Sequence, residues 1–227
     1  MFPIGDTEIR GAKPAVVTIS LVILNVLVFL FEATLSQGAL ENFYRQYAVI
    51  PADILQGRHL YTLITSMFLH GGWLHLAGNM LFLWVFGDNV ETVLGHIVYL
   101  IFYFAGGLAA SAAHIFFNMG STLPSLGASG AIAAVLGAYL IMFPRSRIRV
   151  LIFTGIGLGV TRVTALLFLG IWALTQLFNG IASLGAPTAQ TSGVAVWAHV
   201  GGFVFGLIVG LAVKGRARNM QFETERA

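Results

Sequence analysis

Two apolar stretches of the chain, each with one polar side chain near its start, decide the fold. Residues 127–143 read Gly-Ala-Ser-Gly-Ala-Ile-Ala-Ala-Val-Leu-Gly-Ala-Tyr-Leu-Ile-Met-Phe. Residues 194–213 read Val-Ala-Val-Trp-Ala-His-Val-Gly-Gly-Phe-Val-Phe-Gly-Leu-Ile-Val-Gly-Leu-Ala-Val. Neither stretch contains a charged residue, and a helix that crosses a bilayer needs about 20 predominantly apolar residues. Both stretches therefore predict transmembrane helices.

The composition of the whole chain supports this prediction. Only 9% of the 227 residues are Asp, Glu, Lys or Arg, whereas soluble domains carry about 25%, so a soluble globular enzyme is excluded. Hydrophobic residues make up 57% of the chain, which excludes disorder. Because there is no cysteine, a disulfide scaffold, a thiolate metal site and a cysteine nucleophile are excluded as well. The net charge of +3 is too small to indicate a nucleic-acid partner, and we expect none.

Apolar stretches long enough for helices occur six times along the chain. They run roughly over residues 15–35, 73–94, 97–118, 127–143, 163–180 and 194–213. The pattern predicts an all-α polytopic membrane protein, a six-transmembrane-helix bundle. Its membrane domain would cover residues 15–213, with a short cytoplasmic segment at 1–14 and a basic cytoplasmic tail at 214–227. Residues 147–160 are apolar but contain three glycines, and we expect a membrane-edge segment there instead of a seventh span.

Positive charges indicate the orientation of the six spans. With both termini in the cytoplasm, ten of the twelve Lys and Arg residues lie inside, and only Arg45 and Arg58 lie outside. Cytoplasmic loops carry an excess of Lys and Arg, so the sequence predicts an N-in, C-in topology. The longest outer connection, residues 36–72, is amphipathic and predicts a segment that lies in the membrane interface.

Acidic residues are missing from a long central part of the chain. No Asp or Glu occurs between residues 92 and 222, so two carboxylates cannot meet on facing helices and a paired-aspartate intramembrane protease is excluded. The sequence has no His-Glu-x-x-His run, which excludes a metalloprotease that depends on that motif. No carboxylate or cysteine accompanies the histidines at a telling spacing, and we expect no metal.

Ser129 and His199 are the polar groups of the two quoted stretches. A serine and a histidine can act as nucleophile and general base without a carboxylate if packing fixes the imidazole. Taken singly, a serine in a membrane helix more often bonds to the preceding turn, and a membrane histidine more often bonds to a neighbouring helix. Polar groups inside a membrane are nevertheless functional candidates by default.

Small residues line one face of each of these two helices, and such stripes let helices approach closely in lipid. The expected packing residues are Gly130, Ala133 and Gly137 on the first helix and Gly202, Gly206 and Gly210 on the second. Packing the stripes together would bring Ser129 beside His199. His75 and Asn79 share a face of the 73–94 helix at i and i+4, and both could donate hydrogen bonds to a developing oxyanion. Ordinary bonding between helices would explain them equally well if they stood alone.

These residues resemble the rhomboid family of intramembrane serine proteases. The resemblance covers about residues 60–210 and lies in the following motifs: Phe68-Leu-His70-Gly-Gly-Trp-Leu-His75, His75-x-x-x-Asn79, Gly87-Asp-Asn-Val-Glu91, Gly127-Ala-Ser129-Gly130 and Ala198-His199-x-Gly-Gly202. It implies a six-helix rhomboid-like bundle that cleaves membrane proteins in or near their transmembrane segments, with no cofactor and with the lipid bilayer as its surroundings.

The resemblance also implies roles for single residues. Ser129 would be the nucleophile and His199 the general base, while His75, Asn79 and the Ser129 backbone N–H would form the oxyanion hole. Glu91 would hold the inner end of the second helix. Many family members have an aromatic residue, stacked on the catalytic histidine, at the place of Ala133, so what orients His199 is open, with Trp197 a candidate by proximity.

Two other interpretations remain. An inactive relative would bind membrane proteins and escort them, but such relatives usually lack the serine or the histidine. A small channel or transporter is disfavoured by the missing membrane carboxylates. Because no transit peptide precedes the first span, we expect a bacterial inner membrane. The sequence does not specify the oligomeric state or the natural substrate.

Overall fold

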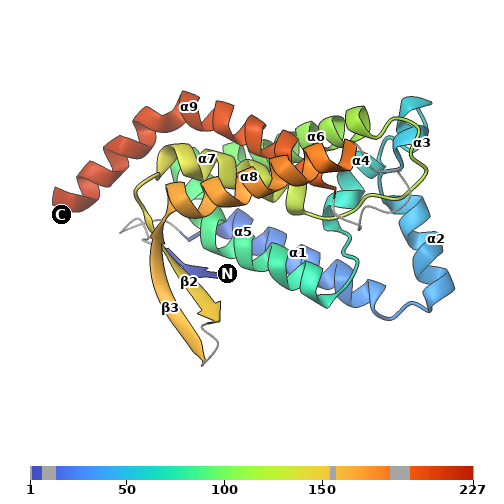
Figure 1. Ribbon diagram of the computed structural model, residues 1–227, viewed down its shortest axis with the longest axis horizontal. Coiled ribbons are helices and arrows are strands. Elements are labelled where there is room, and N and C mark those ends of the chain that lie inside the picture. Colours follow the sequence, from blue (N-terminus) through green and yellow to red (C-terminus); the bar gives the residue numbers. More distant parts are fainter. Residues whose placement is uncertain (1, 7–13, 154–156, 185–194, 227) are drawn as a thin grey trace.

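Helices dominate the part of the chain that the computed structural model describes, residues 2–6, 14–153, 157–184 and 195–226 (Figure 1). The long helices are α1 (Val16–Glu32), α5 (Trp73–Leu94), α6 (His96–Phe117), α7 (Ser129–Met142), α8 (Ala165–Leu184) and α9 (Val196–Arg226). They follow the six predicted stretches in order. Within the described residues, α6, α8 and the Val196–Arg218 part of α9 are long and apolar enough to cross a membrane, and α1 and α7 are shorter apolar helices.

The connection between α1 and α5 folds into short helices at the end of the bundle that lies away from the sheet (Figure 1). These are α2 (Gln37–Tyr47), α3 (Pro51–Leu55), α4 (Thr62–Thr65) and the 3₁₀ helix η1 (Ser66–Phe68). The Tyr44 hydroxyl donates to the His70 carbonyl at 2.8 Å, and the Thr65 hydroxyl donates to the Tyr47 carbonyl at 2.7 Å. These bonds fasten α2 and α4 beside the start of α5.

The structure is mostly helical, as predicted, but it also contains a small sheet that the all-α prediction did not include. Strands β1 (Phe2–Gly5), β2 (Arg147–Phe153) and β3 (Leu158–Thr164) pair antiparallel in the order β1-β2-β3. Arg and β-branched residues alternate at the start of β2, and Ile148 and Val150 are fully buried on one face. Period-two alternation of this kind favours a half-buried strand. Strand β2 and the start of β3 occupy residues of the 147–160 segment, for which no seventh span was expected.

Helix α7 forms the centre of the bundle. It packs against α5, α6, α8 and α9, and every residue from Gly130 to Tyr139 is buried. A helix that is apolar on all sides lies in a protein core or in a membrane, and other helices surround α7 on several sides. The first residue of α7, Ser129, is therefore held by neighbours on several sides.

Glu91 of α5 joins α5 to the first turn of α1. Its carboxylate accepts hydrogen bonds from the Val17 and Thr18 backbone N–H groups at 2.9 and 2.8 Å and from the Thr18 hydroxyl at 2.7 Å. The same carboxylate lies 2.6 Å from the His96 ring. A carboxylate satisfies the free N–H groups at a helix start and is favoured there by the helix dipole. Glu91 thus has a structural place far from Ser129, as the resemblance implies.

Candidate active site

Ser129 follows a backbone turn that only glycine fits. Gly127 has φ = +130°, and a Cβ at this position would lie 2.9 Å from the His75 ring and 3.6 Å from the Ser129 hydroxyl oxygen. A side chain would therefore meet both strained backbone and occupied space. The Gly127 N–H donates to the Ser66 carbonyl at 2.9 Å. This turn lets α7 begin at Ser129, with the hydroxyl facing α9.

The hydroxyl oxygen of Ser129 lies 2.8 Å from Nε2 of His199. The two residues are 70 positions apart in the sequence and come from different helices. The distance is that of a hydrogen bond between a nucleophile and its base. The structure thus brings together the two polar groups that the sequence singles out.

Backbone contact between α7 and α9 fixes this distance. A Cβ on Gly202 would lie 2.1 Å from the Gly130 carbonyl oxygen, and one on Gly206 would lie 2.0 Å from the Ala134 carbonyl oxygen. No real side chain tolerates such distances, so the two helices approach as closely as glycine permits. The remaining residues of the expected packing surface lie at the same interface: Ala133, Gly137 and Gly210.

His75 and Asn79 of α5 face the same space as Ser129. The Gly71 backbone N–H donates to His75 Nδ1 at 3.3 Å, so a neutral His75 carries its proton on Nε2, the atom that lies toward Gly127. Asn79 is buried, and its Nδ2 amide has no acceptor among the described residues. Both side chains therefore present hydrogen-bond donors to that space, and neither donor has an acceptor among the described residues.

A cavity of about 610 Å³ is lined by the four residues discussed so far, His75, Asn79, Ser129 and His199. Its walls come from α5 on one side and from α8 on the other, with α7 and the start of α9 between them. Its lining residues are Gly71, Leu74, His75, Gly78, Asn79, Phe82, Leu126, Ser129, Ile132, Leu136, Trp172, Ala195 and His199. None of these residues is acidic. The cavity is thus an apolar cleft with a few convergent polar groups, which is the usual form of a binding site.

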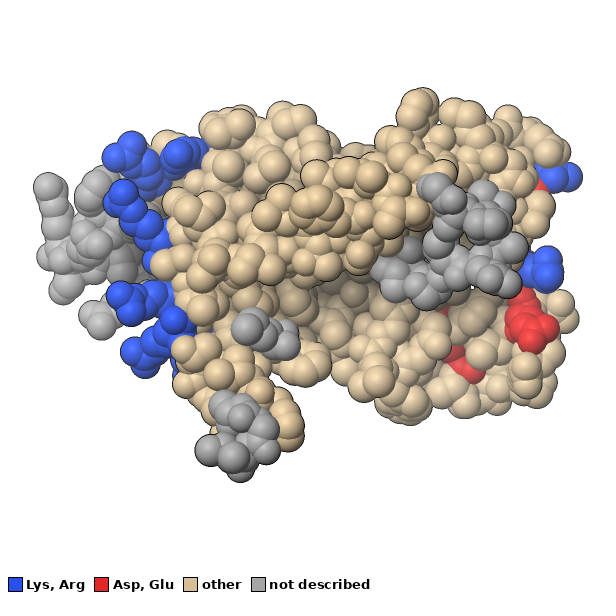
Figure 2. Space-filling view, viewed as in Figure 1, with Lys and Arg blue, Asp and Glu red and all other residues tan. Residues whose placement is uncertain are grey.

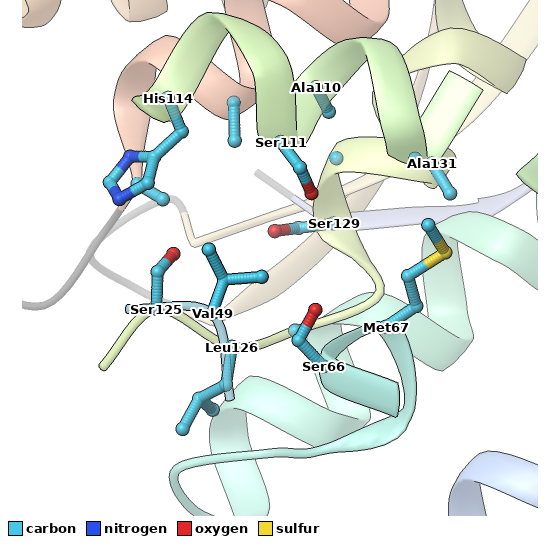
Figure 3. A pocket seen from close by; sticks show the side chains of 15 residues that line it. Val49, Ser66, Met67, Ala110, Ser111, His114, Ser125, Leu126, Ser129 and Ala131 are labelled. Carbon is cyan, nitrogen blue, oxygen red and sulfur yellow. The ribbon is translucent and has the colours of Figure 1, made fainter. Parts of the chain in front are cut away.

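A second, much smaller cavity of about 30 Å³ lies against Ser129 on the side of α6 (Figure 3). Hydroxyl groups of Ser66, Ser111 and Ser125 line it together with His114 and Ser129. A buried water needs a cavity of at least about 10–15 Å³ and several polar partners. The space could therefore hold a water molecule beside the Ser129 hydroxyl.

His70 lies directly beside His75, with ring centroids 5.1 Å apart, and its side chain is fully buried. Its backbone N–H donates to Glu32 at 3.2 Å. Burial, together with the neighbouring His75, lowers the pKa of His70 to about 4, so this imidazole is neutral at pH 7. The described residues hold no group of three or more His, Asp or Glu side chains that could bind a metal ion.

Two residues of α8, not anticipated from the sequence, contact His199. Gln176 Oε1 lies 2.8 Å from His199 Nδ1, and the Trp172 ring centroid lies 5.8 Å from that of His199. Trp197 was a candidate for orienting His199 because it is close in sequence. This prediction was wrong, since the Trp197 ring stacks on the Phe117 ring with the centroids 3.7 Å apart. One signal was available, because Trp172 and Gln176 stand at i and i+4 on a largely apolar helix and share one face.

Comparisons with known proteins bear on the family of the chain. The Rhomboid domain profile matches residues 57–216. Rhomboid protein 1, mitochondrial, of Saccharomyces cerevisiae is 29% identical over 196 residues, 79% of this chain and 50% of the relative. Rhomboid protease GluP of Bacillus subtilis is 30% identical over 216 residues, 90% of this chain and 40% of the relative. RHOMBOID-like protein 12, mitochondrial, of Arabidopsis thaliana is 28% identical over 227 residues, 92% of this chain and 62% of the relative.

The chain spans 40% to 62% of the length of these three relatives. The domain match, in contrast, covers well over half of this chain and includes His75, Asn79, Ser129 and His199. The chain belongs to the rhomboid family, whose members are generally intramembrane serine proteases.

Proposed function

We propose that the chain is an intramembrane serine endopeptidase that hydrolyses peptide bonds in or near transmembrane segments of membrane proteins. The observation that carries the proposal is the 2.8 Å distance between the Ser129 hydroxyl and His199 Nε2, at the wall of a cavity large enough for an extended peptide segment. Both members of a nucleophile–base pair are present, which disfavours an inactive relative that only escorts membrane proteins. A channel or transporter gives no reason for this pairing.

The chemistry follows from the two atoms. His199 Nε2 takes the proton of the Ser129 hydroxyl while the oxygen attacks the carbonyl carbon of the scissile bond. The protonated His199 then gives this proton to the leaving amine, and an acyl-enzyme ester on Ser129 remains. A water molecule then gives a proton to the same Nε2 atom and attacks the ester carbonyl. As the ester bond to Ser129 breaks, His199 returns this proton to the Ser129 oxygen, and the carboxylic acid is released.

The tetrahedral intermediate places negative charge on the former carbonyl oxygen. His75 Nε2, Asn79 Nδ2 and the Ser129 backbone N–H are the donors we assign to this oxygen. The Ser129 N–H belongs to the first turn of α7, where backbone N–H groups have no partner within the helix. Donors that are held in place before the reaction stabilise charge without reorganisation.

For the membrane arrangement, we propose six crossings with both termini in the cytoplasm. The membrane domain is then residues 15–213, between a cytoplasmic segment at 1–14 and a cytoplasmic tail at 214–227. Figure 2 supports this orientation, because Lys and Arg side chains gather at the end of the molecule with the sheet and the C-terminal part of α9. A 14-residue α7 is about 21 Å long, shorter than the about 30 Å hydrocarbon core, so Ser129 would lie below the outer surface.

The proposed position of Ser129 below the outer membrane surface also indicates which molecules the protein acts on. The proposed substrates are transmembrane proteins that reach the cavity from the lipid, and nucleic acid has no role. We propose a bacterial inner membrane as the location of the protein. The relatives named above include two mitochondrial proteins and one from Bacillus subtilis, and fractionation of the source cells tests the proposed location.

Labelling with a fluorophosphonate probe tests the proposed function. The purified chain in detergent should react at Ser129, because only an activated serine attacks such a probe at a useful rate. Ser129→Ala should abolish the label and His199→Ala should reduce it to background. A folded wild-type chain that stays unlabelled would leave the escort or channel interpretations standing.

A further inference from the structure

His199 has a second polar contact besides Ser129. Its Nδ1 atom lies 2.8 Å from the side-chain oxygen Oε1 of Gln176, which stands on α8, 23 positions earlier in the chain. Gln176 also lines a side cavity of about 230 Å³ together with Trp172, His199 and Phe203. The amide thus faces α9 and not the lipid.

The contact has a direct chemical meaning. A neutral imidazole carries a single N–H, on either Nδ1 or Nε2. To accept the Ser129 proton, His199 must have a free lone pair on Nε2 and its proton on Nδ1. An amide oxygen accepts hydrogen bonds and cannot donate them, so Oε1 beside Nδ1 stabilises the tautomer that catalysis requires.

We propose that Gln176 is a positioning residue that fixes the tautomer and the ring orientation of His199, so that Ser129, His199 and Gln176 form a relay with a neutral third member. This inference rests on the proposed function. An amide suits the site because an ionised carboxylate inside a membrane is expensive to bury, and the residues lining the cavity include no acidic side chain. Trp172, one turn away on α8, supports the same ring from the side.

The relay makes the dyad depend on the position of α8. Ser129 and His199 come from α7 and α9, which touch backbone to backbone, whereas the orienting groups come from α8. Most of α8 is exposed, since only Ala165, Leu169 and Gly180 are buried along its length. His199 therefore has its orienting partner only while α8 lies against α9.

Kinetics of Gln176 variants test the inference. Gln176→Leu keeps the size and suits an apolar helix but removes the acceptor, and Gln176→Ala serves as a second variant with a smaller side chain. With a transmembrane substrate in detergent, both should lower kcat about tenfold, the usual effect of one hydrogen bond, while KM stays within about twofold. Thr175→Val is the matched control, because Thr175 is exposed and, among the described residues, its hydroxyl bonds only to Ile171 on its own helix.

A measurement of the tautomer needs no activity. In nitrogen-15 spectra of histidine-labelled chain, with His199 identified by its loss in His199→Gln, the wild type should show Nδ1 protonated and Nε2 bare. Gln176→Leu should give a mixture of tautomers or the reverse one, and Thr175→Val the wild-type pattern.

The outcomes separate the two proposals. A wild-type chain that neither cleaves nor takes the fluorophosphonate probe overturns the proposed function, whatever the tautomer. If the wild type is active while both Gln176 variants keep kcat within twofold and the Nδ1–H tautomer persists in Gln176→Leu, the role of Gln176 is refuted and the proposed function stands.

Discussion

Helices α7 and α8 both contribute to the candidate active site, but they are held very differently. In α7, ten consecutive residues from Gly130 to Tyr139 are buried, and glycines bring its backbone against α9. In α8, bulky side chains such as Leu167, Leu174 and Phe178 are exposed. The two helices therefore have different roles in the site. The α7–α9 pair sets the distance between Ser129 and His199, whereas α8 supplies orienting groups and one wall of the cavity and is free to respond to lipid or substrate.

Removing a member of the dyad should have the largest effect. Ser129→Ala and His199→Ala should each lower proteolysis by more than about a thousandfold, since losing either member of a nucleophile–base pair removes most of the chemical rate. Both variants should keep the wild-type melting temperature in detergent. Turnover above roughly 1% of wild type in either one, well over the residual rate such pairs leave, would point to another nucleophile or base.

The α5 side of the cavity should have the next largest effect. Asn79→Ala should lower kcat about 10²–10³-fold, the usual effect of losing one oxyanion donor, with a smaller change in KM. His75→Ala should act in the same direction but more weakly, because Asn79 and the Ser129 N–H remain. If kcat is unchanged in both, α5 does not face the reacting carbonyl.

A methyl group added in the α7–α9 contact should cause the third largest loss of activity. Gly202→Ala places a Cβ 2.1 Å from the Gly130 carbonyl oxygen, so the two helices must separate. A displacement of 1 Å can lower the rate about 100-fold when reacting groups must align, and we expect a loss near that size together with a lower melting temperature. Wild-type activity in this variant would contradict the account of a distance fixed by backbone contact.

The same change on α8 should have the smallest effect and serves as the control. No described residue outside the neighbouring turns of α8 lies within 4 Å of a Cβ built on Gly170, so Gly170→Ala should leave kcat within about twofold of wild type. The melting temperature should stay or rise, because alanine is a better helix former than glycine by roughly 1 kcal/mol. Equal losses in Gly170→Ala and Gly202→Ala would erase the contrast between the two helices.

The sequence predicted the helical part of the fold well, because hydropathy and small-residue spacing are local properties. It failed for the sheet. The alternation at the start of β2 is a local signal, but the pairing of Phe2 with Leu151 between β1 and β2 joins residues so distant in the chain that nothing local announces it. The prediction of Ser129 beside His199 rested on glycine stripes that dictate which faces meet.

The orientation of His199 could not be predicted in the same way. Trp197 and His199 stand at i and i+2 on α9, and residues at this spacing do not face each other on a helix. The contact with Gln176 depends on how α8 is rotated against α9. The largely apolar sequence of α8 does not determine this rotation, because bulky apolar side chains occur on most faces of the helix.

Cleavage in a bilayer is the most direct test of whether Ser129 is the nucleophile of an intramembrane protease. The wild type and Ser129→Ala are reconstituted into liposomes with a single-span substrate protein, and the products are identified by mass spectrometry. We expect the wild type to cut the substrate within or at the edge of its transmembrane segment and Ser129→Ala to yield no product. Cleavage by Ser129→Ala at the same bond, or no cleavage of any membrane-embedded substrate by a folded wild type, would contradict this role of Ser129.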